Sequence, residues 1–217
     1  MSELIKTVYQ GGVGELIEKK SRFIATVMPC ESEEAALAFI DSLKKKYWDA
    51  RHNCSAYTIG MRHEITHCSD DGEPAKTAGR PMLDVLLNED IHNVCVVVTR
   101  YFGGILLGTG GLVRAYQGAV KEGLANSILI EKQFGIRLRV TTDYNSIGKL
   151  QYLFASEDYA VLSTEYTDAV AVRILVSPER LPALTEKITE VTSGSAGIEE
   201  EKRLWFSRNG KDVLLFE

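Results

Sequence analysis

The sequence predicts an α+β fold built from two consecutive domains, at residues 1–132 and 135–217. Up to about Ser127, apolar periodicity predicts strands and helices in alternation, which is typical of a mixed sheet packed against helices. From Ile136 onward the predicted order is strand, helix, strand, strand, helix, strand, the order of a ferredoxin-like domain. Gln133-Phe134-Gly135 lies where the first pattern stops and the second starts, so we place the boundary there.

The first domain opens with predicted strands at Leu4–Val8 and Arg22–Met28, with a hairpin segment at Glu15–Lys20 between them. Ser32 then precedes two glutamates and predicts a helix N-cap. That helix carries its apolar residues at spacings of three and four, on one face: Ala36, Phe39, Ile40, Leu43 and Tyr47.

Further along, Asn53–Ile59 is predicted as a strand and Met61–Ser69 as a loop or short ribbon. Pro81 is expected to open the helix at 81–87, because a proline loses little at the first helical position. The apolar run Asn93–Thr99 predicts a buried strand, and a helix is expected to begin near Leu112. We expect these helices on one side of the sheet.

The second domain is predicted to follow the ferredoxin-like order throughout. Its expected elements are strand Ile136–Thr142, helix Asn145–Ser156, strands Tyr159–Tyr166 and Ala169–Val176, helix Pro182–Thr192 and strand Gly197–Phe206. The apolar tail Val213–Phe216 is expected to add a terminal strand.

Composition excludes several classes of protein. The net charge is −5, so a protein that coats nucleic acid nonspecifically is not expected, and any RNA contact needs a local basic patch. No apolar run reaches the roughly 18 residues of a membrane span, and the chain does not begin with a signal peptide. We therefore expect a cytoplasmic protein without a membrane partner, and reduced cysteines at 30, 54, 68 and 95.

The most distinctive segment is a glycine-rich loop between the strand at 93–99 and the helix near Leu112. It contains Gly103, Gly104, Gly108, Gly110 and Gly111. Such a loop before a helix gathers backbone N–H groups that can bind an anion, and Arg80, Arg100 and Arg114 would add charge around it. The spacing matches neither a P-loop nor a dinucleotide fingerprint, so no nucleotide fold is indicated. A tight packing turn remains the alternative.

A second cluster joins Asp70, Asp71 and Glu73 in a turn shaped by glycine and proline. These carboxylates can cap the next helix and pair with arginines. They can also serve, with His52, as the acid and base of a hydrolase. No nucleophile elbow or Ser-His-Asp spacing supports the hydrolase.

Histidines and cysteines suggest a weaker alternative, a zinc site. The candidate ligands are His52, Cys54, His63, His67 and Cys68. Because no C-x-x-C pair accompanies them, we expect neither a metal nor another cofactor, and treat these residues as surface or core side chains.

Four blocks of the chain together resemble the IMPACT family, in its YigZ-like bacterial branch, and they occur in the family's order. They are Arg51-His52-Asn53-Cys54-Ser55-Ala56-Tyr57, Asp70-Asp71-Gly72-Glu73-Pro74, Thr77-Ala78-Gly79-Arg80-Pro81 and residues 100–111. The resemblance implies a first domain like the second domain of small-subunit ribosomal protein five and a ferredoxin-like second domain. Both are similar to the last two domains of elongation factor G.

This resemblance implies a non-enzymatic, translation-associated protein that binds RNA or the ribosome and regulates translation. In eukaryotic members it implies translation control under amino-acid stress through a partner of a regulatory kinase. Met1 leads directly into the family core here, so that kinase route is not expected, whereas a protein partner in translation control is kept as a hypothesis. The alternative is a small metal- or carboxylate-dependent hydrolase of a phosphate-containing or peptide substrate, using His52, Asp71 and Glu73.

Overall fold

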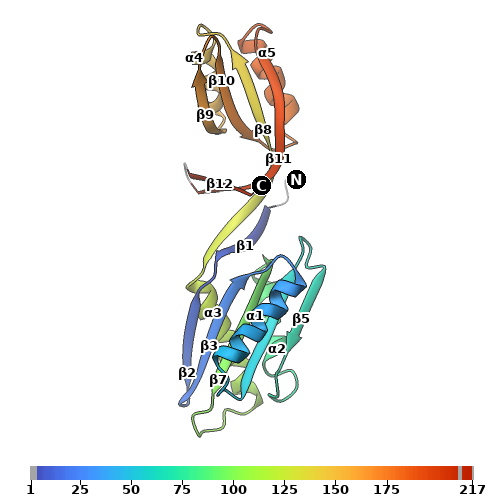
Figure 1. The fold of residues 1–217 in the computed structure, drawn as a ribbon, viewed down its shortest axis with the longest axis vertical. Helices are drawn as coiled ribbons and strands as arrows, with labels where there is room; N and C mark the ends of the chain where they lie inside the picture. The colour runs from blue at the N-terminus through green and yellow to red at the C-terminus, as the bar shows by residue number, and fades with distance from the viewer. Residues whose placement is uncertain (1–3, 210–211, 217) are drawn as a thin grey trace. The chain divides into compact units, whose positions relative to one another are not determined.

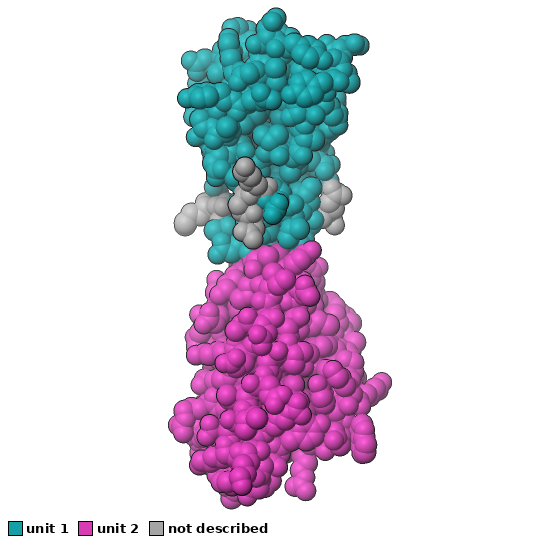
Figure 2. All heavy atoms as spheres, turned by 90° about the vertical axis from the view of Figure 1, so that its left-hand side faces the viewer, with its two compact units in different colours: residues 1–4, 131–217 teal, residues 5–130 magenta. Residues whose placement is uncertain are grey.

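The computed structural model describes residues 4–209 and 212–216, and its contacts divide the chain into two compact units (Figure 2). Ile5–Ile130 forms what we call the N-terminal unit. Glu131–Glu217, with Met1–Leu4, forms the C-terminal unit. The predicted domains, 1–132 and 135–217, stay a prediction about independent folding.

The N-terminal unit is built on a five-stranded antiparallel sheet with the order β2-β3-β7-β4-β5 (Figure 1). These strands are β2 (Val13–Glu18), β3 (Ser21–Pro29), β4 (His52–Ile59), β5 (Ile65–Ser69) and β7 (Val94–Tyr101). A short parallel pair, β1 (Leu4–Gln10) with β6 (Ile91–His92), lies outside this sheet.

Helices cover both faces of this sheet, which corrects the expectation that they lie on one side. α2 (Gly79–Asn88) and α3 (Thr109–Ala125) pack against Val94, Val96 and Val98 of β7, whereas α1 (Glu33–Lys46) packs against Cys95 and Val97. In Figure 1, α1 lies in front of the sheet. A strand with helices on both faces is apolar at every position, because neither face meets water. The unbroken run in β7 was therefore the signal for two layers of helices.

Local capping explains where the helices begin. Ser32 accepts a hydrogen bond from the backbone N of Ala35 at 3.2 Å, which confirms the predicted N-cap of α1. α2 begins at Gly79, two residues before Pro81, and α3 begins at Thr109 rather than near Leu112. The first turn of α3 thus contains two of the loop's glycines. Among the described helices, none is both long and apolar enough to cross a membrane.

The C-terminal unit has the predicted ferredoxin-like order, with an antiparallel sheet ordered β9-β10-β8-β11-β12. Its elements are β8 (Ile128–Thr142), α4 (Ile147–Ser156), β9 (Ala160–Tyr166), β10 (Val170–Val176), α5 (Leu181–Val191), β11 (Gly197–Asn209) and β12 (Asp212–Phe216). The two helices pack on the sheet through Leu150, Phe154, Leu184 and Ile188. The apolar tail forms β12 and pairs with β11, as predicted.

Strand β8 starts eight residues before the predicted Ile136 and runs without a break through the expected boundary at 133–135. Phe134 stands opposite Trp205 on β11, with ring centroids 5.6 Å apart. Gly135 lies within strand β8 and not in a turn. A Cβ at this position would lie 2.5 Å from Cε1 of Phe206. The glycine that suggested a linker is needed for close packing of a ring inside a strand.

Candidate functional site

The carboxylate turn between β5 and α2 is held by its own side chains, beginning with Asp70. Its Oδ1 accepts hydrogen bonds from the backbone N of Ala78 at 2.9 Å and of Gly79 at 2.8 Å. Its Oδ2 accepts one from the backbone N of Lys76 at 2.8 Å. Asp70 therefore caps α2 from eight or nine residues away, a role that the N-cap residue Ala78 cannot perform with its methyl group.

We expect Asp70→Ala to lower the free energy of unfolding by about 2 kcal/mol, because three backbone donors lose a charged acceptor. Asp70→Asn should recover part of the loss, since its amide oxygen can still accept. Chemical denaturation of the three proteins measures both effects. Equal stability of the alanine variant and the parent would show that water replaces the cap.

Asp71 ties the same turn to two other elements of the N-terminal unit. Its Oδ2 accepts from the backbone N of Asn53 at 2.7 Å, and its Oδ1 accepts from Nζ of Lys44 at 2.7 Å. Its carbonyl oxygen lies 2.9 Å from Nδ1 of His52, which therefore donates to it. Asp71 and Gly72 both have positive φ, 42° and 86°, so the turn is tight. Asp71 thereby joins the turn to β4 and to the end of α1.

Glu73 points into the protein. Its Oε1 accepts from Nη1 of Arg100 at 2.6 Å and from the hydroxyl of Tyr116 at 2.8 Å. The side chains of Glu73 and Arg100 are only 3% and 8% exposed. The prediction that Arg100 stands at the rim of the glycine loop is thus corrected: Arg100 lies beneath the turn, with its guanidinium 5.3 Å from the ring centroid of Phe23. An arginine inside the core needs such a partner, and the sequence separates the two residues by 27 positions.

Cys54 and Tyr116 complete this buried network. The Cys54 thiol donates to the carbonyl oxygen of Asp70 at 2.9 Å and lies 3.3 Å from the Tyr116 hydroxyl. Burial raises the pKa of Cys54 to about 12, and burial together with the neighbouring Cys54 and Glu73 also raises the pKa of Tyr116. Both groups stay protonated at neutral pH. The thiol therefore lacks the thiolate form that a nucleophile requires.

These hydrogen bonds count against the hydrolase alternative. Glu73 is buried against Arg100 and Tyr116, and Asp71 accepts from Lys44 and a backbone N–H. A general base needs lone pairs that face a substrate. Of the three residues in that alternative, His52 alone lines an open pocket. The arrangement favours a structural role for the carboxylates.

The glycine loop approaches the β2–β3 turn so closely that a side chain cannot fit. A Cβ on Gly103 would lie 2.0 Å from the carbonyl carbon of Lys20. Gly108, the N-cap of α3, has φ 73°, a left-handed conformation that favours glycine. The first residues of α3, Thr109 and Gly110, are exposed. The loop therefore presents the N-terminus of α3 to solvent, as an anion site requires.

A pocket of about 600 Å³ lies beside this loop, at the end of the sheet where β4 starts and β7 ends. It is lined by Asp49, Arg51, His52, Arg100, Tyr101, Phe102 and Leu106. We call this lining, together with Trp48, which precedes the lining residue Asp49 in the chain, the pocket face. Arg51 forms no ion pair with any residue in the described ranges, and the buried Nε of Arg100 has no hydrogen-bond partner among them.

Large apolar side chains of the pocket face are exposed to solvent. Trp48 is 83% exposed, Leu106 81% and Phe102 52%. Trp48 lies in the turn that follows α1, two residues after Lys46. Sequence reasoning had not assigned a role to these three residues. The signal that could have identified Trp48 is an aromatic residue in a polar turn, because such a residue is not expected to pack in the core.

The other residues of the predicted anion site do not gather at this pocket. Arg114 is exposed and lines a second pocket of about 230 Å³ with Leu16, Lys19 and Leu107. Arg80 is on α2, where its Nε lies 2.7 Å from Oδ1 of Asp84. Gly104 and Gly108 face open space, whereas Gly111 packs against Leu107. The three arginines of the predicted anion site therefore lie apart: Arg100 lines the first pocket, Arg114 lines the second, and Arg80 is on α2.

The predicted zinc ligands also separate. Cys54 belongs to the buried network, His52 lines the pocket, and the ring of His67 stacks on Tyr57 with centroids 5.3 Å apart. His63 lies instead against His92, with ring centroids 3.9 Å apart.

Comparisons with known proteins show which family this chain resembles. The Impact N-terminal domain matches residues 19–124, and a domain of unknown function, DUF1949, matches residues 140–195. The chain is 40% identical to IMPACT family member YvyE of Bacillus subtilis over 194 residues, covering 89% of each chain. It is 35% identical to IMPACT family member YigZ of Escherichia coli, covering 82% of this chain and 88% of that one.

A eukaryotic relative and a solved structure also match. Protein IMPACT of Mus musculus is 35% identical over 124 residues, which are 55% of this chain and 36% of the mouse protein. A crystal structure titled as that of a hypothetical protein aligns with 93% of this chain at a TM-score of 0.59 and 32% identity. The matched segments include the carboxylate turn and the glycine loop and, in the second half, the part from the end of β8 through α5. The chain belongs to the IMPACT family, among its bacterial members.

Proposed function

We propose that this protein is a cytoplasmic, translation-associated RNA-binding protein, and that single-stranded RNA binds at the pocket face. The observation that supports the proposal most directly is the exposure of Phe102 and Leu106 in a pocket that Arg51 also lines, with the exposed Trp48 one residue before the lining residue Asp49. Exposed aromatic rings cost free energy in water unless a partner covers them. Bases have the flat apolar faces that cover such rings.

Two contributions to binding follow from this chemistry. Base stacking on an exposed ring contributes about 1–3 kcal/mol for each base, with little dependence on sequence. Cations beside the rings bind the phosphate groups and make the affinity depend on salt. Arg51 lines the pocket and forms no ion pair with the residues that the structure describes, so its guanidinium can donate to a phosphate oxygen. Leu106 would then contact the sugar or base as an apolar surface.

The overall charge limits how strong this interaction can be. At a net charge of −5, long-range attraction to RNA is weak, so the few cations near the loop supply most of the electrostatic binding. We expect modest affinity, with recognition of flexible single strands rather than of a duplex.

Family membership supports the link to translation. The relatives named IMPACT in frog and mouse match 44% and 55% of this chain, and the Impact N-terminal domain model matches residues 19–124, the part that contains the pocket face. The chain spans about a third of those longer proteins, so a shared protein partner in translation control is a separate proposal.

The proposal can be tested by replacing arginines and measuring how RNA affinity depends on salt. Replacing Arg51 of the pocket face and Arg114, which lines the second pocket beside the same loop, by alanine should weaken binding and reduce the slope of log affinity against log salt by about 1 to 2 units. Arg100→Ala is unsuitable for this test, because it would break the buried pair with Glu73. Filter binding of a short oligouridine across a salt series measures the slope.

A matched double variant, Lys149→Ala with Arg203→Ala, removes the same charge from exposed positions of the C-terminal unit. It should leave the slope unchanged. Equal slopes for the two double variants would move the RNA contact away from the loop. Co-sedimentation with ribosomes that is lost at high salt would link the same surface to the ribosome. Hydrolysis of a phosphate ester or peptide that is lost in His52→Ala would favour the hydrolase instead.

A further inference from the structure

Three side chains converge at another place in the N-terminal unit, where the β4–β5 turn meets the segment between α2 and β7. Oδ1 of Asp90 lies 3.2 Å from Nε2 of His63 and 3.2 Å from Nε2 of His92. Their candidate ligand atoms all lie within 4.8 Å of one another. His92 is 5% exposed, whereas the side chain of Asp90 is 74% exposed. The cluster is therefore anchored in the core and open on one side.

The position of the protons makes this cluster unusual. Nδ1 of His92 lies 3.2 Å from the carbonyl oxygen of Gly60, which can only accept, so Nδ1 carries a hydrogen. In the neutral ring, Nε2 then has a lone pair, and this lone pair faces the carboxylate of Asp90, which also only accepts. Two acceptors at 3.2 Å repel unless a proton or a cation lies between them.

The two imidazole rings are stacked, with centroids 3.9 Å apart and an interplanar angle of 10°. Nδ1 of His63 is buried and has no hydrogen-bond partner in the described part of the chain. The two Nε2 atoms both lie close to the Asp90 carboxylate, so a cation there has three candidate ligand atoms. Lone pairs in nearly parallel rings do not converge on one point, so one imidazole ring has to turn out of the stack when the ion binds.

The distances fit such an ion. Zinc binds imidazole nitrogen and carboxylate oxygen at about 2.0–2.2 Å with tetrahedral geometry, which separates neighbouring ligand atoms by about 3.3 Å. Both measured separations from Asp90 are 3.2 Å. The Nδ1–H bond of His92 to a backbone carbonyl is the arrangement that usually orients a metal-bound histidine.

The backbone around the cluster turns through left-handed conformations. His63, Asp90 and Asn93 all have positive φ, between 52° and 54°, which these residue types adopt more readily than most. The Asn93 side chain joins the two segments, because its Oδ1 accepts from the backbone N of Gly60 at 2.8 Å.

We propose that His63, Asp90 and His92 bind a divalent transition-metal ion, with Zn²⁺ as the best-fitting one and water in the fourth position. Two imidazoles and one carboxylate suit Zn²⁺ and disfavour Mg²⁺. The ion would link the β4–β5 turn to the segment before β7 and stabilise that end of the N-terminal unit. His63 was one of the ligands considered from sequence, but Asp90 and His92 lie 27 and 29 positions beyond it.

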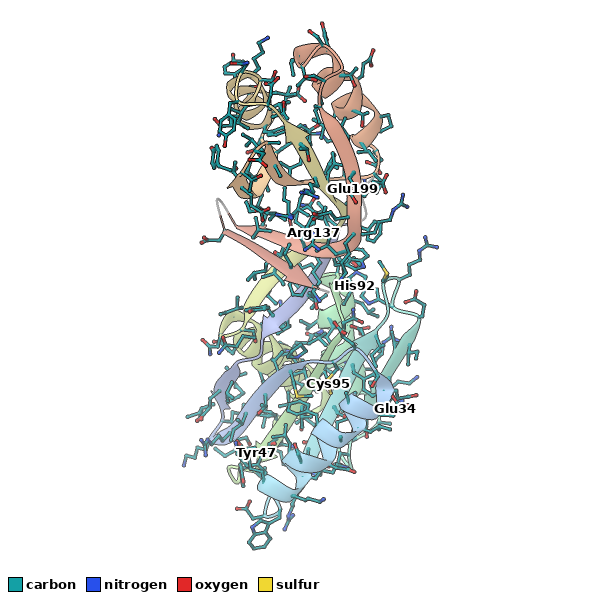
Figure 3. All side chains as sticks on the ribbon, turned by 45° about the horizontal axis from the view of Figure 1, so that its top comes forward. Glu34, Tyr47, His92, Cys95, Arg137 and Glu199 are labelled. Atoms are coloured by element: carbon teal, nitrogen blue, oxygen red, sulfur yellow. The ribbon has the colours of Figure 1, made fainter. Side chains whose placement is uncertain are left out.

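This site is independent of the proposed RNA contact. Figure 3 shows His92 and Tyr47 at opposite ends of the N-terminal unit, and Tyr47 directly precedes Trp48 of the pocket face. Loss of one activity should leave the other intact.

Titration of the chelator-treated protein with Zn²⁺ by calorimetry tests the proposal. We expect one ion to bind and the melting temperature to rise with it, and Co²⁺ to give the visible absorption of a four- or five-coordinate site. Asp90→Asn should weaken Zn²⁺ binding at least about tenfold, and His63→Asn more. Asparagine tolerates positive φ, so both variants keep the backbone. His67→Ala removes a histidine from the same hairpin and should bind as the parent does.

The absence of Zn²⁺ binding by the parent protein would overturn the metal site, and so would equal affinity in the parent, Asp90→Asn and His63→Asn. Binding of Mg²⁺ as tight as that of Zn²⁺ would likewise contradict an imidazole site.

Discussion

Glu73→Ala should lower the free energy of unfolding by about 3–5 kcal/mol, the largest effect we expect from a single substitution in this protein. The change removes the carboxylate that accepts from Nη1 of Arg100 and from the hydroxyl of Tyr116. Arg100 then stays buried with an unpaired charge, because its side chain is 8% exposed. Tyr116, which is fully buried, loses one of its partners as well.

Urea denaturation followed by fluorescence measures this loss. Asp84→Ala is the matched control, because it removes a carboxylate that pairs with an exposed arginine, Arg80, and should cost less than about 1 kcal/mol. Glu73→Leu with Arg100→Met should cost less than the sum of the two single changes, since no charge is left unpaired. A loss below about 1 kcal/mol for Glu73→Ala would mean that Arg100 reaches solvent easily.

Trp48→Ala should weaken the binding of single-stranded RNA by about 1–3 kcal/mol, roughly 5- to 150-fold, if the ring stacks on a base. Its stability should match that of the parent, because the side chain is 83% exposed and contributes little to the core. Fluorescence anisotropy of a labelled oligouridine at constant salt measures the affinity.

Tyr152→Ala is the matched control for this substitution. Tyr152 is an aromatic residue on α4 that is 77% exposed and belongs to the C-terminal unit. Its removal should leave RNA affinity unchanged. Equal losses in both variants would point to a nonspecific effect of exposed rings, and unchanged affinity in Trp48→Ala would exclude this residue from the RNA contact.

The sequence by itself determined most of the secondary structure and the family. Helix α1, with its Ser32 cap, and the ferredoxin-like order of the second half follow from signals within a few residues of each other. The motif blocks between residues 51 and 111 were sufficient for the family. Such information is local, because capping and periodicity depend on neighbours along one element.

The tertiary structure alone decided how side chains from distant segments meet. Glu73 finds Arg100 and Tyr116 at separations of 27 and 43 residues, so an arginine expected at a surface rim became the centre of a buried network. Gly135 resembled a linker but lies inside a strand against Phe206, and His63 meets His92 rather than His67. Strand register and chain reversal at turns set these encounters, and a pattern along one segment contains no record of the segment that packs against it.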